Sequence, residues 1–430
     1  MILLGGVVFL MMQGMPVAFS FLFVNLVVLY FVMGEGGLRQ LTLSIYDSLT
    51  KFNLTPIPLF TLMGEILYHS GLALRTLDVV SKFLGAIRAR LTVLSIISGA
   101  IFAALSGSTI ANTAMLGSLM LPEMRQRGYS KPMSIGPLMA SGSLAMIIPP
   151  SALTVLLGSL ASISIGKLLI GGIIPGIMIA CLYVVYVMIR CWINPKLAPA
   201  YEVASVSSSE RVVALVSDVL PVGGIIFLVT GLIFLGVATP TEAASLGALG
   251  TLLLARIYGK LNYSVVKKSV TGTLDVAVMT FMIIAGSGAF SQLMAYTGAT
   301  RGLVATALAL PLAPIMIFIS MQVVVLILGC FIEQVSIMMI TLPMFMPLVT
   351  TFGFDPVWFG IIMLINLEVA MLSPPFGMLL FVMKGVAPPD ITMGDIYQSA
   401  IPFVLLDLAA MAILTIFPPI ATWLPYLIKA

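Results

Sequence analysis

Apolar runs separated by short polar segments recur along the whole chain. Many of these runs approach the roughly 20 residues that an α-helix needs to cross the hydrocarbon core of a bilayer. In the first part of the chain they predict helical segments over residues 1–13, 16–33, 55–70, 72–90, 91–124, 132–163 and 166–190. In the second part they predict segments over residues 212–237, 240–257, 270–295, 300–311, 313–350, 355–386 and 395–423. The pattern indicates an all-α polytopic membrane protein with about ten transmembrane helices.

The segment 91–124 differs from a straight span because the polar stretch ALSGSTIANT interrupts it. Its first arm, from Leu91 to Leu105, has only 15 residues, which is shorter than a full span. Basic residues lie on both sides, in RARL and RQRGYSK, so both ends are predicted on the cytoplasmic side. We expect a re-entrant hairpin with SGST at its tip, and a tight pair of ordinary spans is the alternative.

The two parts of the chain resemble each other at a nearly constant spacing. MASGSLAMIIPP aligns without gaps with LINLEVAMLSPP, 225 residues later, and three further matches have offsets between 224 and 227. Each part has five predicted crossings, an odd number, so the two parts face opposite sides of the membrane. The sequence predicts inverted repeats over 1–193 and 212–430, joined by a cytoplasmic loop over 194–211. Their hairpins are 91–124 and 313–350, and their broken helices are 132–163 and 355–386, an organisation typical of secondary transporters.

Composition excludes a water-soluble domain. Only 8% of the 430 residues are charged, against roughly a quarter in soluble proteins, and the mean hydropathy is +1.17. A zinc protease is excluded because the sequence has one histidine, His69. The chain has no P-loop motif, and Cys181, Cys191 and Cys330 suggest no disulfide scheme. We therefore expect no enzyme activity and no nucleic-acid partner.

Each predicted broken helix carries a proline pair, Pro149-Pro150 or Pro374-Pro375. Proline costs about 3 kcal/mol inside a helix, so two together unwind the backbone and free carbonyl oxygens. Such groups persist at membrane depth only where they are buried in protein or line a cavity. Free carbonyls opposite a hairpin tip suit Na⁺; a plain helix kink is the alternative.

The 225-residue offset makes Glu333 the counterpart of Ser108 at the second hairpin tip. An ionisable residue at this depth is a functional candidate, for Na⁺, for a proton or for a charge partner. The alternative is a shallow hairpin with Glu333 among the headgroups. Four further polar residues interrupt the broken helices as two corresponding sets, Ser141 with Asn366 and Ser143 with Glu368.

With these residues in place, the chain resembles the large membrane subunit of tripartite ATP-independent periplasmic (TRAP) transporters. The resemblance rests on GMPVAFSF, PIPLFTLMGEIL, SGSTIANTAMLGSLMLPEM, IIPPSA, GVATPTEAA and LSPPFGMLLFVMKGVAP, which span nearly the whole chain. It implies Na⁺-driven import of an organic anion, commonly sialic acid or a C4-dicarboxylate, by an elevator mechanism. It also implies a bacterial inner-membrane location in contact with lipid, a separate small four-helix membrane subunit and a periplasmic binding protein.

The resemblance also implies site residues. One Na⁺ site would comprise Ser106, Gly107, Ser108, Asn112, Pro149 and Pro150. A second would comprise Gly329, Glu333, Gln334, Ser373 and Pro374, although its tip, GCFIEQ, is no copy of the first. The expected substrate-binding residues are Ser141, Ser143, Ser151, Asn366 and Glu368. Two rivals stay open: a stand-alone Na⁺/dicarboxylate or citrate carrier, and a channel with hairpins as its filter.

Overall fold

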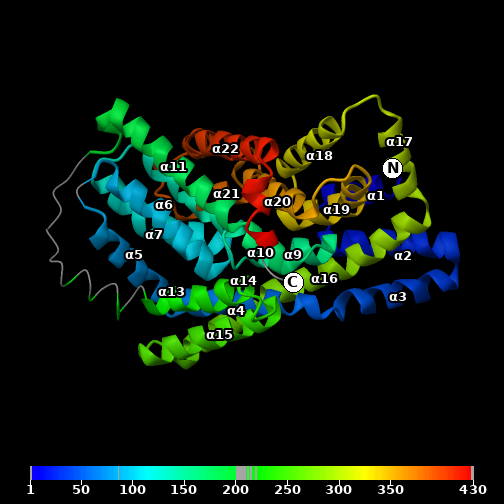
Figure 1. Cartoon of the computed structure of the whole chain (residues 1–430), viewed down its shortest axis with the longest axis horizontal. Helices are drawn as coiled ribbons and strands as arrows, with labels where there is room; N and C mark the ends of the chain where they lie inside the picture. The colour runs from blue at the N-terminus through cyan, green and yellow to red at the C-terminus, as the bar shows by residue number, and fades with distance from the viewer. Residues whose placement is uncertain are drawn as a thin grey trace.

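The computed structural model describes residues 2–85, 87–199 and 220–427, together with residues 210, 213, 216 and 217. The described residues form helices joined by short connections, and none of them lies in a β-strand (Figure 1). Most of the predicted cytoplasmic loop over 194–211 lies outside the described residues.

One set of helices, named here the scaffold group, packs around the long helix α16. Its members are α1 (Ile2–Met12), α2 (Val17–Met33), α3 (Glu35–Leu49), α4 (Pro56–His69), α13 (Leu220–Ile226), α14 (Leu232–Phe234), α15 (Pro240–Ile257) and α16 (Tyr263–Tyr296). Helix α16 packs along α2, α3 and α4, and α15 packs along α4. Figure 1 shows α3, α4, α15 and α16 together along the lower side of the molecule.

Helix α3 is an element for which the sequence pattern gave no prediction. Its buried residues Gly37, Leu41, Ser44 and Ser48 recur at spacings of three or four, which is the periodicity of one helix face. Three of these four residues are small or polar, so no apolar run marks the helix. The packing of α3 against α2 and α16 explains why such residues are buried.

A second set, named here the hairpin group, contains both proline breaks. Its members are α6 (Arg90–Ser106), α7 (Thr109–Gln126), α8 (Lys131–Ser143), α9 (Ala152–Ala161), α10 (Ile165–Gly171), α11 (Ile173–Ile193), α18 (Pro314–Gly329), α19 (Gln334–Thr351), α20 (Pro356–Leu372), α21 (Met378–Val386) and α22 (Met393–Ile416). Among the described residues, three short helices lie outside both groups: α5 (Leu72–Phe83), α17 (Ala299–Ala309) and α23 (Pro419–Thr422). The α6–α7 and α18–α19 pairs occupy the two segments predicted as hairpins, and residues 147–151 and 373–377 interrupt the two predicted broken helices.

Two buried hydrogen bonds join residues that the predicted repeat makes equivalent. The Ser143 hydroxyl donates to Glu368 Oε1 at 2.6 Å, across 225 residues. The Tyr183 hydroxyl donates to Asp407 Oδ1 at 2.5 Å, across 224 residues. Equivalent residues of a two-fold repeat touch each other only where the symmetry axis passes. The predicted axis therefore runs between α8 and α20 and between α11 and α22.

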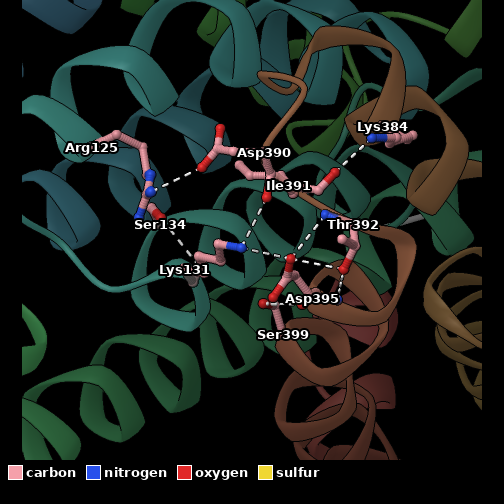
Figure 2. Close-up of polar contacts among 9 residues, drawn as sticks. All are labelled: Arg125, Lys131, Ser134, Lys384, Asp390, Ile391, Thr392, Asp395 and Ser399. Carbon is pink, nitrogen blue, oxygen red and sulfur yellow. Dashed lines mark hydrogen bonds and ion pairs between the residues drawn. The ribbon is translucent and has the colours of Figure 1, made fainter.

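Basic residues mark one end of the hairpin group (Figure 2). Arg125 pairs with Asp390 at 3.1 Å, and Lys131 pairs with Asp395 at 2.8 Å. The Lys131 ammonium also donates to the Asp390 carbonyl at 3.0 Å. These contacts place the end of the first hairpin beside the connection between α21 and α22. By the positive-inside rule this end is the predicted cytoplasmic end.

The opposite end of the hairpin group is marked by Tyr426. Its hydroxyl donates to Asp355 Oδ2 at 2.6 Å, which raises the pKa of Tyr426 to about 12. The Lys167 ammonium lies 4.8 Å from the centre of the Tyr426 ring. The starts of α10 and α20 and the residues after α23 therefore lie together, at the end predicted to face outward.

Four described helical segments are long and apolar enough to cross a membrane: Ile165–Ile193, Tyr263–Tyr296, Gln334–Thr351 and Met393–Ile416. Other apolar helices, among them Arg90–Ser106 and Pro356–Leu372, have 10 to 17 residues. These two are short because a hairpin tip ends Arg90–Ser106 and a proline break ends Pro356–Leu372. The total of ten crossings stays a prediction.

Candidate functional site

The first hairpin tip is a two-residue turn held by its serines. Gly107 has a φ of +58°, in the left-handed region that favours glycine. The backbone N–H of Ser108 donates to Ser106 Oγ at 3.3 Å. The hydroxyl of Ser108 accepts the N–H of Ala111 at 3.3 Å and so caps α7. Ser106, Gly107 and Ser108, the predicted tip residues, thus each have a structural role in the turn.

This tip touches the first helix break. A Cβ atom on Gly107 would lie 3.2 Å from the carbonyl oxygen of Pro150, so a larger residue would crowd the present approach. In the break, Ser151 caps α9 by accepting the Thr154 N–H at 3.3 Å. The Ser151 hydroxyl donates to the Met146 carbonyl at 2.8 Å. The hairpin residues and the proline pair Pro149-Pro150, which were predicted to form the first Na⁺ site, are therefore adjacent.

Asn112 ties the first hairpin to the broken helix. Its amide nitrogen donates to the Gly99 carbonyl at 3.1 Å and to the Ser141 carbonyl at 3.4 Å. Its amide oxygen is buried and has no hydrogen-bond partner among the described residues. An unpartnered buried acceptor costs free energy, and a cation would satisfy it.

The second tip is capped by a carboxylate instead of a hydroxyl. Glu333 accepts the N–H groups of Val335 at 2.9 Å and Ser336 at 2.8 Å, and the Ser336 hydroxyl at 2.5 Å. The following residue, Gln334, is buried, and its amide oxygen has no partner among the described residues. Glu333 is therefore a helix cap, which sequence comparison with Ser108 did not specify.

The second tip also lies beside its helix break, because the ring centres of Phe331 in the tip and Phe376 in the break are 6.3 Å apart. A Cβ atom on Gly329 would lie 2.4 Å from the Cβ of Ala370, on α20. Gly329, Glu333 and Gln334 line a cavity of about 190 Å³ with residues flanking the second break, among them Ala370 and Phe376. The predicted ligands Ser373 and Pro374 lie half-buried in that break.

The two tips and two breaks create eight helix ends. The carboxyl ends of α6, α8, α18 and α20 present carbonyl oxygens and partial negative charge, which favour a cation. The amino ends of α7, α9, α19 and α21 present N–H groups and favour an anion. Glu333 occupies the amino end of α19, whereas neutral serines cap α7 and α9. The first half therefore offers the stronger anion-attracting ends.

The predicted substrate-binding residues, Ser141, Ser143, Ser151, Asn366 and Glu368, are fully buried. Asn366 donates to the Gln322 side chain at 2.8 Å, and Glu368 accepts from Ser143. All five are enclosed within the hairpin group in this conformation. Their role in binding the solute stays a prediction.

Sequence reasoning gave no role to Gly64, although it lies in the PIPLFTLMGEIL stretch. A Cβ atom on Gly64 would lie 2.2 Å from the carbonyl oxygen of Ser106. Helix α4 of the scaffold group thus packs directly on the first tip. The signal that the sequence offered was the glycine itself, because an isolated glycine inside a helical pattern usually has a packing reason.

A family model of the "Tripartite ATP-independent periplasmic transporter, DctM component" matches residues 4–420. The chain belongs to this family. It is a transporter permease and a multi-pass membrane protein, and the family it belongs to consists of transport components rather than enzymes.

Relatives of this DctM chain span its full length. The C4-dicarboxylate TRAP transporter large permease protein DctM of Rhodobacter capsulatus is 30% identical over 450 residues, covering 100% of this chain and 99% of the relative. The sialic acid permease SiaM of Vibrio cholerae is 27% identical, and the match covers 97% of this chain and 96% of that protein. The isethionate permease DctMQ of Oleidesulfovibrio alaskensis is 30% identical, covering 97% of this chain but 65% of that protein.

A solved structure shares the fold at lower identity. MtrF of Neisseria gonorrhoeae, described as representing a class of antimetabolite efflux pumps, aligns with a TM-score of 0.67 and 16% identity. The alignment covers 90% of this chain and 85% of that chain. The likeness supports the architecture and carries no substrate assignment.

Proposed function

We propose that this DctM chain is the transport subunit of a Na⁺-driven importer of an organic anion, moving it from the periplasm to the cytoplasm. The observation that carries the proposal is the position of each hairpin tip beside a helix break. Gly107 lies against Pro150, and the ring centres of Phe331 and Phe376 are 6.3 Å apart. At each of the two places, carbonyl oxygens of a hairpin tip lie close to carbonyl oxygens of a helix break. Similar motifs in transporters hold Na⁺ between unwound segments.

The residues present fit Na⁺ at both tips. Na⁺ is a hard cation and takes oxygen ligands, here from Ser106, Ser108 and the carbonyls of the first break. The buried amide oxygens of Asn112 and Gln334 lack donors among the described residues, so each tip has an acceptor that a cation would satisfy. At the second tip, the Glu333 carboxylate lowers the cost of holding a cation.

The anion is a C4-dicarboxylate, sialic acid or a related organic acid, because the names of the relatives state C4-dicarboxylates and sialic acid. Its carboxylate would face the amino ends of α7 and α9, which neutral serines cap. The hairpin group moves against the scaffold group as an elevator. Gly64 and Ser106 lie at the boundary across which that movement would occur.

The importer has two further components, a small four-helix membrane subunit and a periplasmic substrate-binding protein, in a bacterial inner membrane. The match to only 65% of the DctMQ permease supports the small subunit, because that relative contains additional chain. The binding protein selects the solute and delivers it to the outward end. The match to the DctM family favours this arrangement over a stand-alone carrier.

Uptake into proteoliposomes containing this chain and its two partner components tests the proposal. We expect uptake to require an inward Na⁺ gradient, and Ser108→Ala to raise the half-saturating Na⁺ concentration about threefold to tenfold, since one hydroxyl ligand contributes about 1 kcal/mol. Ser164→Ala is the matched control. Ser164 caps α10 by accepting the Lys167 N–H, so its loss removes a cap away from the tips.

Three results would count against the proposal. Passive flux without a Na⁺ gradient would identify a channel. Full uptake without the binding protein and small subunit would identify a stand-alone carrier. An unchanged Na⁺ dependence in Ser108→Ala, with intact uptake, would place the first ion elsewhere.

A further inference from the structure

A polar cavity of about 240 Å³ lies between the two helix groups, and Met338 and Pro343 of α19 are among the residues that line it. The scaffold group contributes Asp47 and Ser48 from α3 and Ser287 and Ser291 from α16, and Lys51 follows α3. Ser159 and Ser162, at the end of α9, face them from the hairpin group. We name this cavity the serine pocket.

The serine pocket lies at the outward end of the hairpin group. Helix α8 begins at Lys131, at the predicted cytoplasmic end, and the chain runs through the break to the end of α9 at Ala161. The Ser159 hydroxyl lies 3.5 Å from the Asn53 carbonyl, just after Lys51. A solute arriving from the periplasm would therefore reach this pocket before it reached the buried breaks.

The chemistry of the lining is unusual for a transmembrane chain. Ser48 and Ser287 form a buried floor, whereas Asp47 and Lys51 are exposed at the rim. Neither Asp47 nor Lys51 forms an ion pair within 4 Å in the described part of the chain. The pocket thus combines one free cation, one free carboxylate and several hydroxyls.

We propose that the serine pocket receives a compact, hydroxyl-rich monocarboxylate, and this inference rests on the proposed import of an organic anion. Lys51 binds the solute carboxylate by a charge-assisted hydrogen bond. The serine hydroxyls bond to the solute's hydroxyl groups, and Asp47 accepts from one of them. The small volume, near the lower end of the roughly 300–1,000 Å³ typical of ligand sites, favours a short sugar acid.

A dicarboxylate fits this lining less well. Its second carboxylate would lack a cationic partner, because Lys51 is the one basic residue among those that line the pocket. It would also meet the negative charge of Asp47, and like charges in a confined site repel. The single positive charge of Lys51 and the negative charge of Asp47 therefore favour a monocarboxylate over a dicarboxylate in this pocket.

Calorimetric titration of the purified protein in lipid nanodiscs tests this assignment, with gluconate and succinate as probes, in sodium chloride or choline chloride. We expect gluconate to bind the wild-type protein more tightly than succinate does. Lys51→Gln should weaken gluconate binding at least tenfold, and Lys51→Arg should keep it within about threefold, since a hydrogen bond to a charged group contributes about 1.5–3 kcal/mol. Asp47→Asn should weaken gluconate and improve succinate binding.

Lys167→Gln is the control, because Lys167 lies at the same end of the molecule but stacks on Tyr426. It should leave both titrations unchanged. Tighter binding of succinate, absence of gluconate binding, or wild-type affinity in Lys51→Gln would overturn the proposal. Lys51-dependent gluconate binding that is equal in sodium and choline would uphold the pocket, while the Na⁺ coupling of uptake is tested separately in proteoliposomes.

Discussion

Gly329→Val is expected to abolish most Na⁺-driven uptake while the protein still inserts and folds. The added Cβ would lie 2.4 Å from Ala370 Cβ and 3.0 Å from Ala370 Cα. Ala370 is buried in α20, so the second tip must move away from its break. Overpacking of this kind costs about 1–3 kcal/mol, and displaced carbonyls no longer converge on one cation.

The effect of Gly329→Val is measured as uptake and as Na⁺-dependent thermal stabilisation at constant ionic strength. Apparent Na⁺ affinity should fall at least tenfold, which would reduce the stabilisation at a fixed Na⁺ concentration. Gly302→Val is the control, because a Cβ on Gly302 meets no atom within 4 Å. Wild-type Na⁺ dependence in Gly329→Val would show that the second tip holds no ion.

Gly64→Val is expected to reduce the uptake rate at least tenfold by a different route. Its Cβ would lie 2.2 Å from the Ser106 carbonyl oxygen and 2.9 Å from Ser106 Cα. Both are backbone atoms, so the contact of α4 with the first tip cannot persist. The substitution therefore destabilises the conformation in which the scaffold and hairpin groups meet here, and it shifts the population away from that conformation.

Cysteine labelling provides the readout for Gly64→Val, in a protein whose Cys181, Cys191 and Cys330 are replaced by alanine and which carries one introduced cysteine at Ser106. Its reactivity toward a water-soluble maleimide should rise as α4 and the tip separate, while Gly250→Val leaves it unchanged. A Cβ on Gly250 meets its nearest neighbour at 3.8 Å. Normal uptake together with unchanged labelling would show that the contact between Gly64 and Ser106 has no part in the transport cycle.

Local sequence features were sufficient to predict where the helices end at SGST and at the two proline pairs, whereas the re-entrant course of the hairpins stays a prediction. The 15-residue arm before SGST and the two proline pairs impose helix ends by length and by loss of N–H donors. The DctM match supports the family resemblance built on these motifs. The Ser143–Glu368 and Tyr183–Asp407 contacts join residues separated by the repeat offset, but the offset alone predicted neither contact.

The remaining features depend on packing that sequence spacing does not contain. Helix α3 is stabilised by α2 and α16 and has few apolar residues on its buried face. The capping role of Glu333 depends on the φ and ψ angles at the tip, which an offset to Ser108 does not fix. Lys51 and Ser159 share a pocket only because α3 and α9 meet in space.

Equilibrium binding of radioactive sodium to the purified protein in nanodiscs tests the central claim most directly. We predict two Na⁺ ions bound per chain, displaced by unlabelled sodium but not by choline. Gly329→Val should retain one of them, because its first tip is intact. Absence of sodium-specific binding, or two ions bound equally by the wild-type protein and by Gly329→Val, would contradict the claim that each hairpin tip and its proline break hold one Na⁺.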